Sequence, residues 1–318
     1  MTLDKIGFYT LSEHRAKNVS FHSNLQRCEL ILTHRCNFNC AYCRGIVKEY
    51  RGDLSFTDAK HIVDLWTENN LRNIRFSGGE PTLWEKLPEL VEYTFKKPSI
   101  VRIALSTNGS APLEFYYKLY RLGVNDFSIS LDACCASTAN TMAGKNANFD
   151  HICNVIKELS KITYCTTGVV LDERNVYELQ NIIEYATNLG VSDIRIIPSA
   201  QWNQPLDVNI KTDYPILVYR LHNLKNGRHV RGIREADCHK CHLVKDDMVI
   251  LNDYHFPCII YMREQGEPIG SVSGKTISDI RREREEWFKD HNSFHDNICK
   301  VNCLDVCIDY NNAVEGYL

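Results

Sequence analysis

Residues 28–43 read CELILTHRCNFNCAYC, an almost unbroken run of apolar and β-branched residues followed directly by three cysteines. The first eight of these residues, 28–35, predict a strand that is buried in a sheet. The cysteines at positions 36, 40 and 43 come immediately after it. Sites on parallel sheets lie beyond the carboxyl ends of the strands. The stretch therefore predicts a first strand and a functional loop behind it.

The same alternation of strand and helix continues to residue 199. The further strands are expected at NIRFSGG (73–79), VRIALSTNG (101–109), NDFSISLD (125–132), ITYCTTGVVL (162–171) and DIRIIPS (193–199). Helices fit between them at 55–69, 87–97, 113–122, 149–160 and 176–189. Six such β/α units imply an α/β fold with a parallel sheet and helices on its outer face.

The pattern changes after residue 199. Residues 201–209 read as a linker, residues 214–224 as a short helix, and residues 244–258 as a hairpin that turns at Asn252–Asp253. A charged helix is expected at 276–289. We therefore divide the chain into an N-terminal extension (1–27), an α/β core (28–205) and a small cysteine-rich α+β domain (206–318).

Composition excludes several classes of protein. The chain has 318 residues, of which 44% are hydrophobic and 24% charged, proportions typical of a globular protein and not of a disordered or collagen-like one. The net charge of −3 predicts no general attraction to nucleic acid or anionic lipid. Without an apolar run of membrane-spanning length or a signal-peptide pattern, a cytoplasmic protein with no membrane partner is expected.

Cysteine is unusually abundant, at 14 residues. In a reducing compartment these thiols stay free, so clustered cysteines are expected to bind metal. One cluster is Cys36, Cys40 and Cys43; the last quarter of the chain holds another, made of Cys238, Cys241, Cys258, Cys299, Cys303 and Cys307. The five scattered cysteines are expected to be small core residues.

The first cluster has the spacing of an iron–sulfur loop. Three thiolates can hold three irons of a [4Fe–4S] cluster and leave the fourth iron open. Cys36, Cys40 and Cys43, with Tyr42 before the last of them, resemble the CxxxCxφC motif of the radical S-adenosylmethionine (radical SAM) superfamily, where φ is aromatic. The alternatives are three unrelated core cysteines or a zinc knuckle, for which the sequence offers no close fourth ligand other than His34.

Polar motifs at the ends of the next strands strengthen the resemblance. Two glycines permit a close approach of ligand to backbone at SGGEP, although a glycine turn is the alternative reading. In the superfamily this motif binds the amino group of SAM, and polar residues after strands three and four contact its carboxylate and ribose. The positions that match here are Gly78, Gly79, Glu80, Pro81, Ser106, Asn108, Ser130 and Asp132, with Ile197 as an adenine contact or a core residue.

The resemblance implies a fold and a chemistry. The fold is a partial (β/α)6 TIM-like barrel over residues 28–205. The chemistry is reductive cleavage of SAM to a 5′-deoxyadenosyl radical, which takes a hydrogen atom from the substrate. An external one-electron donor of the flavodoxin or ferredoxin type is the implied partner.

The C-terminal cysteines resemble the SPASM/Twitch extension of this superfamily. Cys241 and Cys258 occupy the two cysteine positions of its first motif, and Asp253 stands where the family has glycine. The resemblance implies one auxiliary [4Fe–4S] cluster held by Cys241, Cys258 and two of the final three cysteines. Cys238 forms a CxxC with Cys241 and is an alternative ligand, and zinc is an alternative metal.

Two weaker features remain. The basic stretch 220–234, with Lys225, Arg228, Arg231 and Arg234, either neutralises an anionic substrate or forms a solvated face. Cys134 and Cys135 follow a strand end and are either hydrogen-atom donors to a substrate radical or inert thiols.

The favoured function is maturation of a peptide natural product by epimerisation or crosslinking. The alternative is a dehydrogenase or mutase that acts on a cyclitol, sugar or nucleotide, and the remote alternative is a non-enzymatic zinc-binding protein. With 27 residues before the first strand, no winged-helix leader-binding domain is expected there. An open groove would favour a peptide, and a pocket closed by residues 243–257 and the C-terminus a small molecule.

Overall fold

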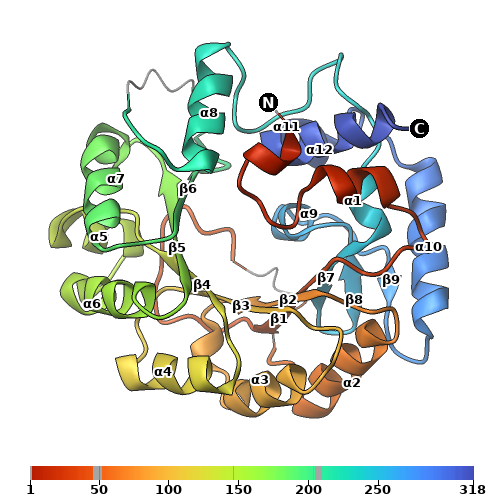
Figure 1. The fold of residues 1–318 in the computed structure, drawn as a ribbon, viewed down its shortest axis with the longest axis horizontal. Coiled ribbons are helices and arrows are strands. Elements are labelled where there is room, and N and C mark those ends of the chain that lie inside the picture. Colours follow the sequence, from red (N-terminus) through yellow and green to blue (C-terminus); the bar gives the residue numbers. More distant parts are fainter. Residues whose placement is uncertain (1, 46–49, 51, 146, 203, 205–209) are drawn as a thin grey trace.

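The strand β1 (Arg27–Thr33) lies inside one curved sheet that runs in the order β6-β5-β4-β3-β2-β1-β7-β8-β9 (Figure 1). This computed structural model describes residues 2–45, 50, 52–145, 147–202, 204 and 210–318. The other strands are β2 (Asn73–Gly78), β3 (Arg102–Thr107), β4 (Asp126–Ser130), β5 (Tyr164–Leu171), β6 (Asp193–Pro198), β7 (Asp247–Leu251), β8 (Tyr254–Phe256) and β9 (Gly270–Ser271). Strands β1 to β7 pair in parallel, and β8 and β9 pair antiparallel.

Helices cover the convex side of the sheet, as expected for a parallel sheet whose strands are mostly buried (Figure 1). They are α2 (Phe56–Thr67), α3 (Leu87–Phe95), α4 (Leu113–Leu122), α6 (Phe149–Ser160) and α7 (Leu179–Asn188). Local signals explain their ends: the Ser55 side chain accepts a hydrogen bond from the Asp58 amide at the start of α2, and Gly123 ends α4 with a φ of 124°. The predicted partial barrel is confirmed.

The sheet crosses the predicted domain boundary. β7 belongs to the C-terminal region and pairs in parallel with β1, with Leu30 opposite Ile250. Apolar side chains on this face, Ile31, Val249, Leu251, Phe256 and Met262, form a core of their own. The hairpin at β7 and β8 occurs where the sequence predicted it. The division at residue 205 stays a prediction, and the two regions share one sheet.

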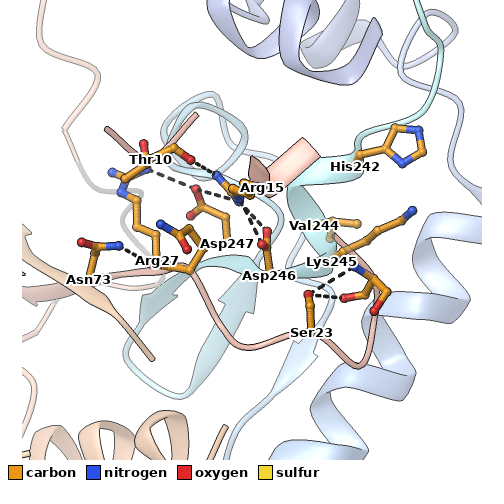
Figure 2. Close-up of polar contacts among 12 residues, drawn as sticks. Thr10, Arg15, Ser23, Arg27, Asn73, His242, Val244, Lys245, Asp246 and Asp247 are labelled. Atoms are coloured by element: carbon orange, nitrogen blue, oxygen red, sulfur yellow. Dashed lines mark hydrogen bonds and ion pairs between the residues drawn. The ribbon is translucent and has the colours of Figure 1, made fainter. Parts of the chain in front are cut away.

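The N-terminal extension packs against the C-terminal region. Helix α1 (Glu13–Asn18) lies beside α12 (Asp305–Glu315), and the buried Arg15 guanidinium donates to both carboxylate oxygens of Asp246 (Figures 1 and 2). Asp247 next to it pairs with Arg27, at 3.6 Å between Nη1 and Oδ2. Apolar residues from both ends of the chain complete this contact together with Tyr219: Leu3, Ile6, Leu11, Val306, Tyr310 and Val314.

Several helices were not expected from the sequence. They are α1, α5 (Ala136–Ala143), α9 (Ile259–Arg263), α11 (Asn297–Asn302) and α12. The remaining elements are α8 (Pro215–Lys225), α10 (Ile277–Asp290) and the short 3-10 helices η1 (Leu3–Lys5), η3 (Pro81–Leu83), η4 (Val176–Glu178) and η5 (His242–Lys245). Among the described residues, every helix is too short or too polar to cross a bilayer.

Candidate functional site

The three cysteines of the first cluster lie on one loop, residues 34–43, at the carboxyl edge of the sheet. This cysteine loop lines a cavity of about 420 Å³, which we call the central cavity. Cys36 and Cys43 are exposed, and Cys40 is half-buried, which raises the pKa of its thiol to about 12. His34, the alternative zinc ligand, accepts a hydrogen bond from the Gly52 amide and is not part of the cavity lining.

The two glycines of SGGEP hold the cysteine loop in place. A Cβ atom on Gly79 would stand 2.2 Å from the Arg35 carbonyl oxygen, and one on Gly78 would stand 2.5 Å from that of Thr33. The Gly79 amide donates to the Thr33 carbonyl at 2.8 Å. Both glycines also line the central cavity. The glycines were predicted to let a ligand approach the backbone closely. In the structure, the segment that closely approaches them is the chain itself, at the start of the cysteine loop.

A second support holds the other side of the loop. The Asn39 amide donates to the Ala143 carbonyl at the end of α5, at 2.9 Å. Gly144 follows with a φ of 65°, and a Cβ atom there would stand 2.2 Å from the Asn39 carbonyl oxygen. Glycine is required here by both its conformation and the close contact. The loop is thus clamped between β2 and α5.

Glu80 is buried and joins two strand ends. One carboxylate oxygen accepts from the Thr107 hydroxyl at 2.8 Å, and the other accepts from the Asn108 amide at 2.7 Å. Thr82 donates to the same carboxylate through its amide and hydroxyl. Burial raises the pKa of Glu80 although these hydrogen bonds lower it. Its side chain is engaged with β3 and does not line the central cavity.

The polar residues after strands three and four also touch the loop. Asn108 donates to the Asn37 side chain at 2.9 Å. The Tyr42 hydroxyl donates to Asp132, which accepts a second hydrogen bond from the Val170 amide at 2.7 Å. Burial raises the pKa of Asp132 to about 6. These contacts hold the Tyr42 side chain at the wall of the central cavity.

The structure brings together most of the predicted SAM contacts. Tyr42, Gly78, Gly79, Ser106, Asn108, Ser130 and Asp132 all line the central cavity. Ser106 also accepts a hydrogen bond from the buried Arg75 beneath the cavity, at 2.8 Å. Pro81 is buried in η3 and Ile197 is half-buried in β6; neither is a lining residue. Ser199 and Ala200, directly after β6, line the cavity instead.

The C-terminal cysteines form one group. Electrostatic interactions connect the sulfurs of Cys241, Cys258, Cys299, Cys303 and Cys307, which we call the C-terminal thiol group. Burial is the first cause that raises the pKa of each of them. Cys238 lies apart, because its sulfur contacts Glu315 at 3.7 Å. Five thiols from three segments supply the four ligands that a [4Fe–4S] cluster requires.

Helix α9 connects the C-terminal thiol group to the central cavity. Its N-cap is Cys258, a member of the group, and the next two residues, Ile259 and Ile260, line the cavity. Arg263 at the end of the helix lines it too and donates to the carbonyls of Gly45 and Gly78. The sequence did not predict this helix, which is only five residues long.

In the part of the chain that the structure describes, three arginines face the central cavity. Arg44 pairs with Glu264 at 2.5 Å, Arg231 donates to the Pro198 carbonyl at 2.9 Å, and Arg263 donates to the two carbonyls given above. Arg231 comes from the basic stretch predicted to meet an anion. From the same stretch, Arg228 and Arg234 pair with Asp309 and Asp237. Among the described residues, the lining therefore holds three arginines against two carboxylates, Glu264 and Asp132.

Cys134 and Cys135 are absent from the lining of the central cavity. Their sulfurs meet Glu178 outside it. Hydrogen-atom donation by either thiol stays a prediction, and the structure gives both thiols other neighbours.

Comparison with known proteins agrees with this geometry. The family model for the radical SAM superfamily matches residues 30–186. A probable GTP 3′,8-cyclase of Saccharolobus islandicus is 30% identical over 182 residues, which are 56% of this chain and 58% of that relative. Another, of Sulfurisphaera tokodaii, is 27% identical over 180 residues, 56% of this chain and 57% of the relative. The chain thus matches little more than half the length of these relatives.

Solved structures resemble the whole fold. Streptococcus suis SuiB bound to its precursor peptide SuiA has a TM-score of 0.61 at 13% identity, covering 87% of this chain and 67% of SuiB. The protein anSMEcpe, solved with AdoMet and the Cp18Cys peptide, has a TM-score of 0.56 at 17% identity, covering 92% of this chain and 96% of its own. At these identities the likeness shows the fold alone.

Proposed function

Because this chain is a member of the radical SAM superfamily through the domain at residues 30–186, we propose that Cys36, Cys40 and Cys43 hold a [4Fe–4S] cluster in the central cavity, with SAM beside it. Three thiols on one clamped loop, all facing one cavity, fit this group. When bound and reduced by an external one-electron donor, the two together supply a 5′-deoxyadenosyl radical that takes a hydrogen atom from the substrate.

The chain's own residues orient and enclose the reactants. The contacts of Gly78, Gly79 and Gly144 fix the loop, so its thiols need little reorganisation when they bind metal. Apolar side chains form part of the cavity wall and exclude water from it: Phe38, Leu131, Met142, Phe149 and Ile152. Polar groups at the ends of β3 and β4 offer hydrogen bonds to SAM, since Ser106, Asn108 and Ser130 face the same space.

The C-terminal thiol group holds one auxiliary [4Fe–4S] cluster in this proposal. Cys241 and Cys258 are two of its ligands, and the others are two of Cys299, Cys303 and Cys307. The observation that supports this most directly is α9, which begins at Cys258 and lines the central cavity with its next residues. Cys238 is left out, because its thiol faces Glu315.

The substrate we favour is a peptide that the enzyme matures by epimerisation or crosslinking. The support is the likeness to SuiB and anSMEcpe, both solved with peptides, over 87% and 92% of this chain. For a small-molecule substrate, residues 243–257 and the C-terminus were expected to close the site. In the described part of the chain, α9 and Arg231 line the cavity, and that hairpin does not.

A second candidate is a small anionic molecule such as a nucleotide. The positive charge of Arg44, Arg231 and Arg263 favours it, because arginine binds phosphate and carboxylate through several hydrogen bonds at once. The relatives named as probable GTP 3′,8-cyclases support the same class.

Iron quantitation and EPR test the two clusters. The anaerobically reconstituted chain should hold about eight irons, and the Cys36/Cys40/Cys43→Ala variant about four, with the SAM-dependent EPR change lost. Four irons in the unaltered chain would contradict the auxiliary cluster. Zinc in place of iron would contradict the enzyme proposal itself.

Formation of 5′-deoxyadenosine identifies the substrate class. Reduced enzyme with SAM is mixed either with GTP or with peptides encoded beside its gene, and 5′-deoxyadenosine and substrate mass are followed. If a peptide accelerates 5′-deoxyadenosine formation and its own mass changes, the result supports peptide maturation. If only GTP accelerates 5′-deoxyadenosine formation, and Arg263→Gln abolishes that acceleration, the substrate would be a nucleotide and the peptide proposal would be wrong.

A further inference from the structure

Two adjacent cysteines and a glutamate meet outside the central cavity. Cys134 and Cys135 lie on the turn between β4 and α5, and Glu178 is the last residue of η4. One ligand atom from each, two sulfurs and a carboxylate oxygen, all lie within 4.8 Å of one another. The three side chains are half-buried, so the group is neither sealed in the core nor dispersed on the surface.

We propose that Cys134, Cys135 and Glu178 bind a zinc ion. Thiolate sulfur and carboxylate oxygen are ordinary zinc ligands, and three protein ligands leave one position of a tetrahedral site for water. This site is separate from both thiol groups of the proposed function and does not depend on it.

The ligands are already held in position by neighbours. The Thr138 hydroxyl donates to one oxygen of Glu178 at 2.9 Å, and the other oxygen faces the Cys134 thiol at 3.6 Å. Cys135 Sγ lies 3.2 Å from the Ser137 hydroxyl and 3.4 Å from that of Thr138. Such outer contacts orient metal ligands and strengthen binding. The Thr138 hydroxyl therefore contacts two of the three proposed ligands, the Cys135 sulfur and the Glu178 carboxylate.

Charge also favours a cation here. Glu178 acts on both thiols, and its negative charge raises the pKa of Cys134 after burial, the larger cause. Hydrogen bonds with Ser137 and Thr138 lower the pKa of the Cys135 thiol. A divalent cation would offset two of the three negative charges of the carboxylate and the two thiolates, with release of the two thiol protons to solvent.

Two other groups of potential ligands are less suited to zinc. Beside Cys238, His242 and Glu315, the ammonium groups of Lys240 and Lys245 oppose a positive charge on His242. The group of His291, Asp296 and Cys299 shares its sulfur with the C-terminal thiol group.

Zinc at this site would brace α5. The cysteines precede the first residue of this helix, and Gly144 at its other end packs against Asn39 of the cysteine loop. A metal bond from the start of α5 to η4 would fix the helix that carries Ala139, Met142 and Ala143 into the cavity wall.

The test is zinc binding by the full-length, iron-loaded protein. The protein is freed of loosely held metal on a chelating resin, and zinc is titrated in anaerobic competition with a chromophoric chelator. Zinc and iron are then counted by mass spectrometry after gel filtration. Cys134→Ser/Cys135→Ser removes the sulfurs, Glu178→Gln removes the charge, and Cys153→Ala is the control, a buried thiol outside the group.

The proposal expects about one zinc per chain in the unaltered protein and in Cys153→Ala. The double serine variant should lose it, and Glu178→Gln should bind it roughly 10–100-fold more weakly. Iron should be the same in all four proteins. Equal zinc in the unaltered and double-serine proteins, or none in either, would overturn the site. Loss of iron in the serine variant would instead assign these thiols to a cluster, which also overturns it.

Discussion

At the residue scale, the candidate site depends on contacts too close for a side chain. The carbonyl of Arg35 occupies the space where a Cβ atom of residue 79 would stand, and the carbonyl of Asn39 does the same at residue 144. Glycine at these positions lets two backbone segments meet directly. The motif SGGEP therefore positions the cysteine loop, and through that loop it positions any group that the three thiols bind.

Gly79→Ala tests this role. The added methyl must displace the cysteine loop, because backbone atoms of residues 34 and 35 stand within 2.7 Å of it. We expect iron to fall from about eight to about four per chain, since the C-terminal thiol group is untouched. Gly316→Ala is the matched control, because its nearest contact is an ordinary 3.5 Å. Full iron in Gly79→Ala would refute the clamp.

A second residue-scale prediction concerns pH. Asp193 at the start of β6 is 3% exposed, and burial raises its pKa from 3.8 to about 6. The folded state therefore binds a proton that the unfolded state releases between these values. Its contribution to stability is greatest at low pH and is lost as the pH rises through 6.

Asp193→Asn should remove this dependence. At pH 7.5 the variant should be more stable than the unaltered protein by on the order of 1–2 kcal/mol, and the difference should vanish near pH 4. Urea denaturation at several pH values measures it, with the exposed Asp213→Asn as control. A variant less stable at pH 7.5 would show that the attraction of Arg195 outweighs burial.

At the scale of elements, the N-terminal helix belongs to the C-terminal region. Arg15 on α1 is 6% exposed and Asp246 is 2% exposed, so their ion pair is buried (Figure 2). The Arg15 guanidinium also lies over the Tyr310 ring of α12, 4.9 Å from its centroid. The pair joins α1, η5 and α12 in one contact.

Arg15→Met should destabilise the protein by about 3–5 kcal/mol, because it leaves the Asp246 carboxylate buried without its partner. Chemical denaturation measures the loss. Arg15→Met/Asp246→Leu should recover part of it, since the double variant has no unpaired charge. Lys86→Ala, which breaks an exposed pair with Glu89, should match the unaltered protein. A single variant as stable as this control would refute the role of the pair.

Sequence patterns predicted elements whose signal is local. The six parallel strands, the hairpin and the cysteine loop follow from runs of apolar residues and from cysteine spacing, and the residues at strand ends do line one cavity. Helices α5 and α9 were missed because they are short and their stability comes from contacts with distant segments. Arg263 was missed for the same reason, since only the packing of α9 brings it to the cavity.

At the scale of the whole molecule, the two regions that carry the thiol groups share one sheet, which neither region completes alone. β1 pairs with β2 on one side and with β7 on the other. The predicted core, 28–205, lacks β7 and would expose the edge of β1 and the apolar side chain of Ile31.

If the chain is divided at residue 205, the N-terminal fragment should therefore not fold on its own. The fragment 28–205 is expected to aggregate or to unfold without a cooperative transition, whereas the full chain should unfold in one transition by both circular dichroism and fluorescence. Co-expression with 206–318 is the control that distinguishes a missing partner from a damaged fragment. A soluble, cooperatively folded 28–205 would establish the predicted core as an independent domain.

The pairing of β1 with β7 also has a consequence for synthesis. Residue 27 meets residue 247, so a growing chain must extend through most of its length before β1 gains its second neighbour. Contacts between positions so far apart form slowly, and the waiting strand edge is open to aggregation. The loop that carries Cys36, Cys40 and Cys43 leaves this same strand. Its final geometry, and with it the uptake of iron, thus belongs to a late step after the ribosome has delivered the C-terminal region.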